Sequence, residues 1–160
     1  MPILSGTGAR RLMRSALLVA CLGLATPSIA VDSSGSSSGG SAASVSALLD
    51  AQTHIKRKRW NEAVAVLKQI IAIEPGNADA LNLMGYSLRK SGDYKRAQGF
   101  YLKALKVSPK HLGANEYLGE LYVETGQLAK AGQRLEALKG ICGTGCEEYR
   151  ELKQAIDAAS

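Results

Sequence analysis

Two cysteines near the C-terminal end of the chain, Cys142 and Cys146, have the types and spacing best suited to chemistry. The residues between them are Gly-Thr-Gly, and the two glycines let the chain bend enough to bring the sulfur atoms into bonding distance. Such a pair can form a structural disulfide, act as a thiol redox centre or bind a metal such as copper. Neither a histidine nor a methionine lies nearby to complete a metal shell, which favours the disulfide and leaves the other two uses open.

No catalytic constellation accompanies the cysteine pair. The chain has two histidines, His54 and His111, and neither has a carboxylate matched to it in the sequence. A phosphate-binding loop, a nucleophile motif and a cluster of histidines and acids at metal-ligand spacing are all missing. We therefore expect a protein that is not an enzyme and that has no catalytic residues, no metal and no cofactor.

The N-terminal segment up to Ala30 has the layout of a secretory signal peptide. Arg10, Arg11 and Arg14 form a basic start, residues 16–25 are uninterruptedly apolar, and small residues stand at Ser28 and Ala30. The apolar run is too short to span a membrane, which takes about 20 residues. We expect cleavage after Ala30 and a periplasmic or secreted protein, and in that setting the two remaining cysteines favour a disulfide.

An alternative to cleavage after Ala30 uses the third cysteine. Leu18-Val19-Ala20-Cys21 resembles the lipobox of bacterial lipoproteins, in which Cys21 would carry lipid and anchor the protein to a membrane. The apolar run continues past Cys21, whereas a lipid-bearing cysteine normally leads into a polar linker. Residues 31–46 are almost entirely serine, glycine and alanine, and they predict a flexible linker after the cleavage point or anchor.

The elements that position the cysteine pair repeat three times at one fixed spacing. Small residues, bulky apolar residues and prolines recur at equivalent places: Ala63, Ala97 and Ala131; Ala51, Gly85 and Gly119; Leu67, Tyr101 and Leu135; Pro75 and Pro109. Gly92 and Gly126 also coincide, with Lys58 at that place in the first copy. This pattern, with its period of about 34 residues, resembles the tetratricopeptide-repeat (TPR) family over residues 44–145.

The resemblance implies an all-α fold, an α-solenoid of three helix-turn-helix units followed by a capping helix. The units are expected at about 44–77, 78–111 and 112–145, within a domain of residues 47–159 that has seven helices and no sheet. The helices expected in the second unit are 78–90 and 94–107. Those of the third are 128–139 and a first helix that begins at His111 or Leu112 and ends at Glu124.

The two ends of the array are expected to be capped. Asp50 and His54 replace apolar residues in the first unit, which suits a terminal repeat, and we expect His54 to face the surface. Helix 147–159 carries Tyr149, Leu152 and Ile156 at helical spacing, and these should cover the apolar side of the last repeat helix.

In this family the first helix of each unit lines a concave groove. The resemblance places the candidate binding residues at Asn82, Tyr86, Arg89 and Lys90 in the second unit and at Glu116, Glu120, Val123 and Glu124 in the third. The first unit contributes Leu48, Gln52, Ile55 and Lys56. Asn82 and Tyr86 are the strongest candidates, because an amide and a phenol can bond an extended backbone. The subtype that grips chaperone C-termini is disfavoured, since Leu48 and Gln52 stand where its basic and amide residues belong and the third unit is acidic.

Charge gives little indication of nucleic-acid binding. The chain carries a formal charge of +6, but three of its lysines and arginines, and none of its acidic residues, lie before Val31. Without that segment 17 basic and 14 acidic side chains remain, a net charge of +3. These charges are dispersed, whereas a nucleic acid requires a clustered basic face. We expect a protein or peptide partner and contact with a membrane only if Cys21 is lipidated.

The sequence thus favours an exported, non-catalytic adaptor that binds a protein or peptide segment in its groove. Two alternatives remain open. The chain could be a thiol redox or metal carrier that uses Cys142 and Cys146, or a structural subunit that assembles through its convex or end surfaces. Because both ends of the array look closed, we expect a monomer.

Overall fold

The computed structural model describes residues 42–160 and contains seven α-helices and no β-strand in that range. The helices are α1 (Ala42–Lys56), α2 (Trp60–Ile73), α3 (Ala78–Lys90), α4 (Tyr94–Val107), α5 (Leu112–Glu124), α6 (Leu128–Cys142) and α7 (Glu147–Ala158). The expected all-α fold with seven helices is confirmed. The predicted signal peptide, the alternative lipid site Cys21 and the linker up to residue 41 lie outside the described residues.

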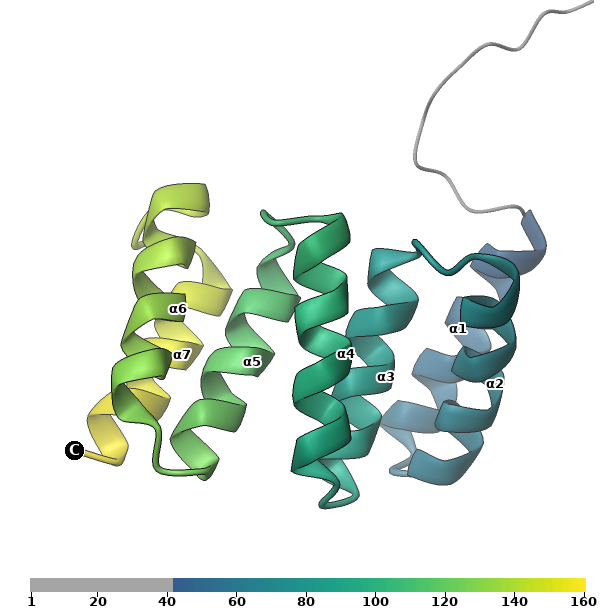
Figure 1. Ribbon diagram of the computed structural model, residues 1–160, viewed down its shortest axis with the longest axis horizontal. Helices are drawn as coiled ribbons and strands as arrows, with labels where there is room; N and C mark the ends of the chain where they lie inside the picture. The colour runs from purple at the N-terminus through teal and green to yellow at the C-terminus, as the bar shows by residue number, and fades with distance from the viewer. Residues whose placement is uncertain (1–41) are drawn as a thin grey trace, which may run out of the picture. The chain divides into compact units, whose positions relative to one another are not determined.

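The helices form three pairs, α1–α2, α3–α4 and α5–α6, and α7 follows the last pair (Figure 1). The helices of each pair pack against each other, and each pair then packs on the next through α2 with α3 and α4 with α5. α7 contacts α6 as α5 contacts α4, so it takes the place that the first helix of a further pair would occupy. Among the helices of residues 42–160, none is both long enough and apolar enough to cross a lipid bilayer.

Two helix boundaries differ from those predicted. Residues 42–46, which were expected in the linker, belong to α1, where the hydroxyl of Ser44 is buried and donates a hydrogen bond to the carboxylate of Glu74. α6 continues past the expected end at residue 139 to Cys142. Its backbone stays helical until Gly143, whose φ of +79° ends the helix.

The turn between the first and the second helix of each pair contains a residue with positive φ. Gly92 (φ +88°) and Gly126 (φ +72°) hold this place in the second and third units. Lys58 holds it in the first unit with φ +56°, a conformation that costs free energy in a residue with a Cβ atom. The three-fold equivalence seen in the sequence therefore extends to the backbone, with one residue poorly suited to its conformation.

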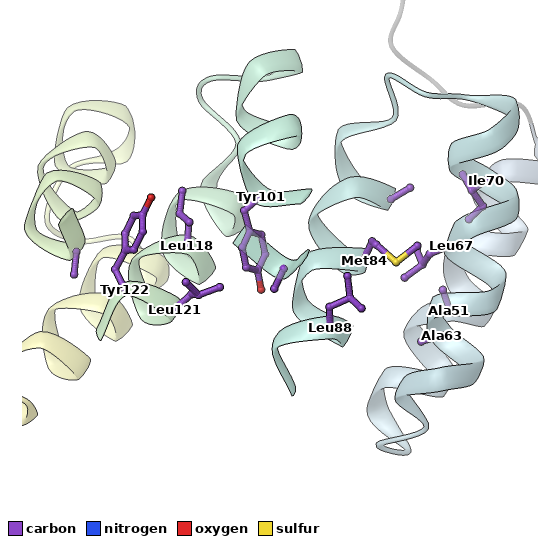
Figure 2. Close-up of a cluster of buried hydrophobic side chains, with 13 residues drawn as sticks. Ala51, Ala63, Leu67, Ile70, Met84, Leu88, Tyr101, Leu118, Leu121 and Tyr122 are labelled. Carbon is purple, nitrogen blue, oxygen red and sulfur yellow. The ribbon is translucent and has the colours of Figure 1, made fainter. Parts of the chain in front are cut away.

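A continuous apolar core runs through the array (Figure 2). Ala63, Leu67, Met84, Leu88 and Tyr101 are buried in it, at places where the repeat pattern requires small or bulky apolar residues. The ring of Tyr101 lies against the backbone of α3, and a Cβ atom added at Gly85 would approach it to 2.7 Å. Glycine at that position therefore sets how closely α3 and α4 approach.

The capping helix α7 is anchored by Leu152, which is fully buried. Leu152 stands one period of the repeat after Leu118, another core residue, and its side chain lies against the backbone of Gly119 on α5. Tyr149 and Ile156 are half-buried. α7 was expected to cover mainly the last repeat helix α6, but it packs against both α5 and α6.

Candidate functional site

The first helices of the pairs line the inner side of the array. The backbone of α1 lies close to that of α3, α3 to α5 and α5 to α7. Within residues 42–160, by contrast, no Cα atoms of α2 and α4, or of α4 and α6, come within 8 Å of each other. An array whose first helices approach each other more closely than its second helices curves toward the first helices. The concave face is therefore formed by α1, α3, α5 and α7, as the sequence predicted for the first three.

Arg89 lies at the centre of this face and is bonded within the protein. Its guanidinium donates to Glu120 Oε2 at 2.5 Å and to Glu124 Oε1 at 2.9 Å, so it links α3 to α5. Its Cζ atom lies 5.5 Å from the ring centre of Tyr86 and 5.7 Å from that of Tyr117, in cation–π geometry. Burial alone would lower the pKa of Arg89, but the acidic groups around it raise it, and the guanidinium stays charged.

Arg89 was predicted to face a ligand, yet only 3% of it is exposed. Its charge is matched by Glu120 and Glu124, so these three residues hold the groove together and offer less to a partner than the sequence suggested. Lys90 is exposed, and its Nζ lies 5.5 Å from the ring centre of Tyr86. Of the two basic groups predicted on α3, Lys90 is accessible and Arg89 is not.

The floor of the groove is aromatic. The rings of Tyr86 and Tyr117 lie 4.9 Å apart, and Trp60 at the start of α2 packs edge-on to Tyr86 at 6.2 Å. All three side chains are half-buried, so part of each stays accessible. Burial raises the pKa of Tyr117 to about 12, which keeps its phenol protonated at neutral pH.

Asn82 and Glu116 occupy equivalent places one period apart, and both carry a buried oxygen atom without a hydrogen-bond partner. Asn82 is 6% exposed and Glu116 is 3% exposed. The Oδ1 atom of Asn82 and the Oε1 atom of Glu116 are buried and accept no hydrogen bond from any described residue. An unsatisfied buried acceptor costs about 1–3 kcal/mol, and such a cost is offset when a ligand supplies the donor.

Glu116 also lies in an acidic environment. Burial is the largest cause that raises its pKa, to about 9. A hydrogen bond shared with the carboxyl group of Glu151 reinforces this shift, as do the charges of Glu120, Glu151 and Glu148. Glu148 and Glu151 come from α7. The capping helix therefore contributes to the groove as well as closing the end of the array.

Sequence reasoning placed the candidate residues of α3 and α5 on one face but missed Trp60, Tyr117, Glu148 and Glu151. Tyr117 directly follows Glu116, and an aromatic residue beside a groove position was a usable signal. The residues predicted on α1 do not join this cluster: Leu48 and Ile55 pack at the edge of the core, and Gln52 and Lys56 are exposed. Val123 likewise packs against the core.

A separate pocket of about 740 Å³ lies at the end of the helices where the units connect. Val45 and Leu48 from α1 and Val107 from α4 form its apolar part. Asp79 and His111 lie at its polar side, and they also contact each other at 3.1 Å.

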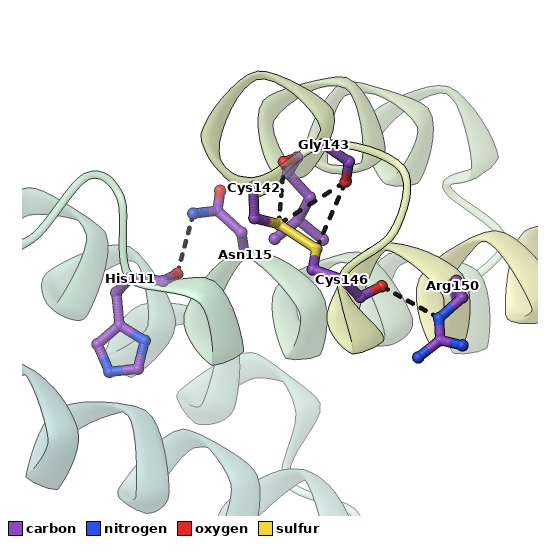
Figure 3. The surroundings of a disulfide bond; sticks show 7 residues. His111, Asn115, Cys142, Gly143, Cys146 and Arg150 are labelled. Atoms are coloured by element: carbon purple, nitrogen blue, oxygen red, sulfur yellow. Dashed lines mark hydrogen bonds between the residues drawn. A yellow bond between two sulfur atoms is a disulfide. The ribbon is translucent and has the colours of Figure 1, made fainter.

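The cysteine pair joins α6 to α7. Cys142 ends α6, Cys146 precedes α7, and their sulfur atoms lie 2.10 Å apart as a disulfide (Figure 3). The carbonyl oxygen of Gly143 faces both sulfur atoms. A carboxylate oxygen of Glu148 lies within 4.8 Å of both cysteines, a potential third donor that the sequence analysis did not anticipate.

Both histidines have acidic neighbours, contrary to the prediction. His111 caps α5: its Nδ1 accepts the N–H of Ala114 at 3.1 Å, which leaves Nε2 to donate to Asp79. His54 is half-buried beside Asp50, at 3.6 Å, because residues four apart share a helix face. These contacts are local to a helix or link neighbouring units, and they give both histidines structural roles.

The family model of the tetratricopeptide repeat matches this chain twice, at residues 54–100 and at residues 88–156. Tetratricopeptide repeat protein 5 of Bos taurus is 32% identical over 76 residues, which are 47% of this chain and only 17% of that protein.

Two solved structures show the same arrangement of helices. The TPR2B domain of yeast Sti1, solved as a pHsp70 complex, has a TM-score of 0.67 at 20% identity, over 74% of this chain and 97% of that one. The Yersinia enterocolitica type III secretion chaperone SycD, solved with a peptide of the translocator YopD, has a TM-score of 0.64 at 16% identity, over 75% and 91%. At these identities the likeness shows the fold.

Proposed function

The chain belongs to the tetratricopeptide-repeat family, and from this premise we propose that it is a non-catalytic adaptor that binds an extended protein segment along its concave face. The segment would lie across α3, α5 and α7 and over the aromatic floor of Tyr86 and Tyr117. Aromatic side chains give such a surface contact area at low entropic cost, since each has two torsions to fix.

The observation that carries this proposal is the pair of unsatisfied acceptors at Asn82 and Glu116. They stand at equivalent places on adjacent inner helices. Both oxygen atoms are closed to solvent, so a donor from a partner would reach them only when neighbouring side chains move aside. A peptide backbone presents N–H groups at regular intervals, and one of them can donate to Asn82 Oδ1. SycD, which shares the fold, was solved with a peptide of the translocator YopD, and the Sti1 domain was solved as a pHsp70 complex, which supports a protein segment as the occupant.

The experiment that tests the groove is selection from a random peptide display library on the purified protein. We expect enriched peptides whose affinity falls about tenfold or more when Asn82→Ala and Tyr86→Ala are combined. Leu102→Ala combined with Lys103→Ala, both exposed on α4, is the matched control and should leave affinity unchanged. If the selected peptides bind the double variant and the wild type with equal affinity, the groove is not their binding site.

We also propose that the adaptor is exported after cleavage at Ala30 and that the Cys142–Cys146 disulfide forms there. Mass spectrometry of the protein purified from a Gram-negative host should find Val31 at the N-terminus and a mass two hydrogen atoms below that of the reduced protein. A lipid-modified N-terminal Cys21 would show the lipoprotein route instead.

A second use of the cysteine pair is metal or redox chemistry, which the proximity of Glu148 favours. Once reduced, two thiolates and this carboxylate would give three donors for a thiophilic cation. Thiol titration and metal analysis of the purified protein discriminate: a stable disulfide without metal leaves only the structural role.

The third possibility, assembly through end surfaces, has an apolar candidate in Val45 and Leu49, both exposed on α1. We nevertheless propose a monomer, because the exposed area is small and α7 covers the other end. Light scattering that gave a stable dimer at micromolar concentration would favour assembly.

A further inference from the structure

Four carboxyl groups meet where α5 and α7 form the end of the groove. Glu116 and Glu120 come from α5, and Glu148 and Glu151 come from α7. Their mutual influence is direct, since the side chain of Glu151 and the charges of Glu120 and Glu148 all act on Glu116. We define these four residues as the acidic end of the groove.

Two of the cations near the acidic end are paired with carboxylates. Arg89 from α3 is bonded to Glu120 and Glu124, and Lys153 of α7 is paired with Asp157 at 2.7 Å. Arg150 donates to the carbonyl of Cys146 and lines a small surface pocket with Glu147 and Glu151. Among the ion pairs of residues 42–160, none includes Glu116, Glu148 or Glu151. Three of the four carboxyl groups of the acidic end therefore have no ion-pair partner in that range, and Glu120 is paired with Arg89.

Glu116 adds an independent observation to the cluster. Its side chain is almost completely buried, and its Oε1 atom has no hydrogen-bond partner within the described part of the chain. A carboxyl group in this state is costly to keep ionised, and the simplest remedy inside the protein is to hold a proton. The proton neutralises the carboxyl group, as a paired cation would.

We infer that the acidic end is a subsite for a basic side chain of the bound segment, the ammonium of lysine or the guanidinium of arginine. The inference rests on the proposed peptide-binding function and names the chemistry of one partner residue. The cation would donate to Glu116 Oε1 and be flanked by Glu151 and Glu148, while its aliphatic stem would lie along the ring of Tyr117. Such a stem covers apolar surface while its head keeps polar contacts.

The arrangement of donors favours an organic cation over a metal ion. Among the described residues, the one group of three metal-ligand atoms within 4.8 Å of one another is Cys142, Cys146 and Glu148. The carboxylates of the acidic end therefore do not converge tightly enough to chelate a bare ion. A larger cation that forms several hydrogen bonds fits their spacing better.

Cation binding at this place must displace the proton held by Glu116. Because proton and cation compete for one carboxylate, affinity should rise with pH up to the raised pKa of Glu116, about 9. The groups that interact with Glu116 in this range are Glu120, Glu148 and Glu151, together with Tyr86 and Tyr117. The two phenols stay protonated, because their pKa values are raised.

The test uses two small probes that differ in one charge, Nα-acetyl-lysine methylamide and Nα-acetyl-norleucine methylamide. Carbon-13 NMR of the glutamate carboxyl groups in the purified protein reports binding at each site. We expect the lysine probe to shift the carboxyl resonances of Glu116 and Glu151 saturably. The norleucine probe should bind more weakly by a factor of about ten or more. The lysine affinity should increase between about pH 7 and about pH 9.

Two variants make the test specific. Glu116→Gln keeps the shape of the side chain and should weaken the lysine probe about tenfold, whereas Glu62→Gln, on the exposed side of α2, should not change it. Equal binding of the two probes, unchanged binding by Glu116→Gln, or shifts caused by calcium chloride and not by the lysine probe would each overturn the inference.

The probes also separate this inference from the groove proposal. If peptides selected on the groove show no requirement for lysine or arginine and the probes fail, the subsite is wrong and the groove stands. If the lysine probe binds at Glu116 while no peptide depends on Asn82 and Tyr86, the groove proposal fails and the cation site remains as an isolated feature.

Discussion

The ring of Tyr101 on α4 lies so close to Gly85 on α3 that a Cβ atom at Gly85 would stand 2.7 Å from it. Because Tyr101 is fully buried, its ring has no free space into which to move. Gly85→Ala should therefore lower the free energy of unfolding by about 1–3 kcal/mol, as overpacking does in other cores. Urea unfolding followed by circular dichroism measures the change.

Gly99→Ala is the matched control for that substitution. Gly99 also lies inside a helix, α4, but nothing stands within 4 Å of its added Cβ. Here alanine should stabilise the protein by about 0.5–1 kcal/mol, because it reduces the backbone entropy lost on folding. Equal effects of the two substitutions would show that the contact with Tyr101 does not limit the packing of α3 on α4.

Lys58→Gly should stabilise the protein, although the lysine is exposed. Lys58 has φ +56° where the other two units have Gly92 and Gly126. Relief of this left-handed conformation outweighs the extra chain entropy of glycine, with a net gain of about 0.5–1 kcal/mol. The comparison is Lys56→Gly, two residues earlier at the end of α1, which should destabilise. A loss of stability in Lys58→Gly, measured by thermal unfolding, would contradict the repeat equivalence.

Leu152→Ala should destabilise the protein more than reduction of the Cys142–Cys146 bond. Leu152 is fully buried, and its truncation should cost about 2–5 kcal/mol. The disulfide closes only a short loop, so its loss should cost less than this truncation does. Calorimetry of the variant and of the reduced protein compares the two losses of stability. Unfolding caused by reduction alone would show that the disulfide contributes more than Leu152.

Glu116→Gln should change how stability depends on pH. The folded protein raises the pKa of Glu116 above the value of about 4.5 expected in the unfolded chain, so the protonated group stabilises the fold most fully at low pH. That contribution is lost as pH rises toward the folded pKa, and glutamine does not titrate. The variant should match the wild type below about pH 4 and exceed it by about 1 kcal/mol or more near pH 8. Parallel curves in chemical denaturation across this range would refute the buried proton.

The fold could be predicted from the sequence because repetition multiplies weak signals. Gly85, Ala97 and Tyr101 are each ambiguous alone, but their recurrence at one period fixes helices, turns and packing together. The same logic located α3 and α4 to the residue, and α5 with its start left open between His111 and Leu112. The repeat could not locate the start of α1, since residues 42–46 share their composition with the linker and only the contact of Ser44 with Glu74 places them in a helix.

The candidate site was predictable only in part. The period places Asn82, Tyr86, Arg89 and Glu116 on one face, but it does not determine which charges are paired within the protein. Arg89 reaches Glu120 and Glu124 from another helix, and that contact depends on the distance between α3 and α5. The contribution of Glu151 was hidden for the same reason, since it comes from a helix beyond the last complete unit.

The position of α7 has a consequence for how the array can change in length. α7 docks on the third unit where the first helix of a fourth would dock, and its anchor Leu152 keeps the period of Leu118. The surface that seats the end piece is thus interchangeable with the surface that seats another unit. A duplicated copy of one whole repeat, inserted before α7, could pack on the third unit and present the same surface to α7. The array could therefore grow by whole units and keep α7 as its capping helix.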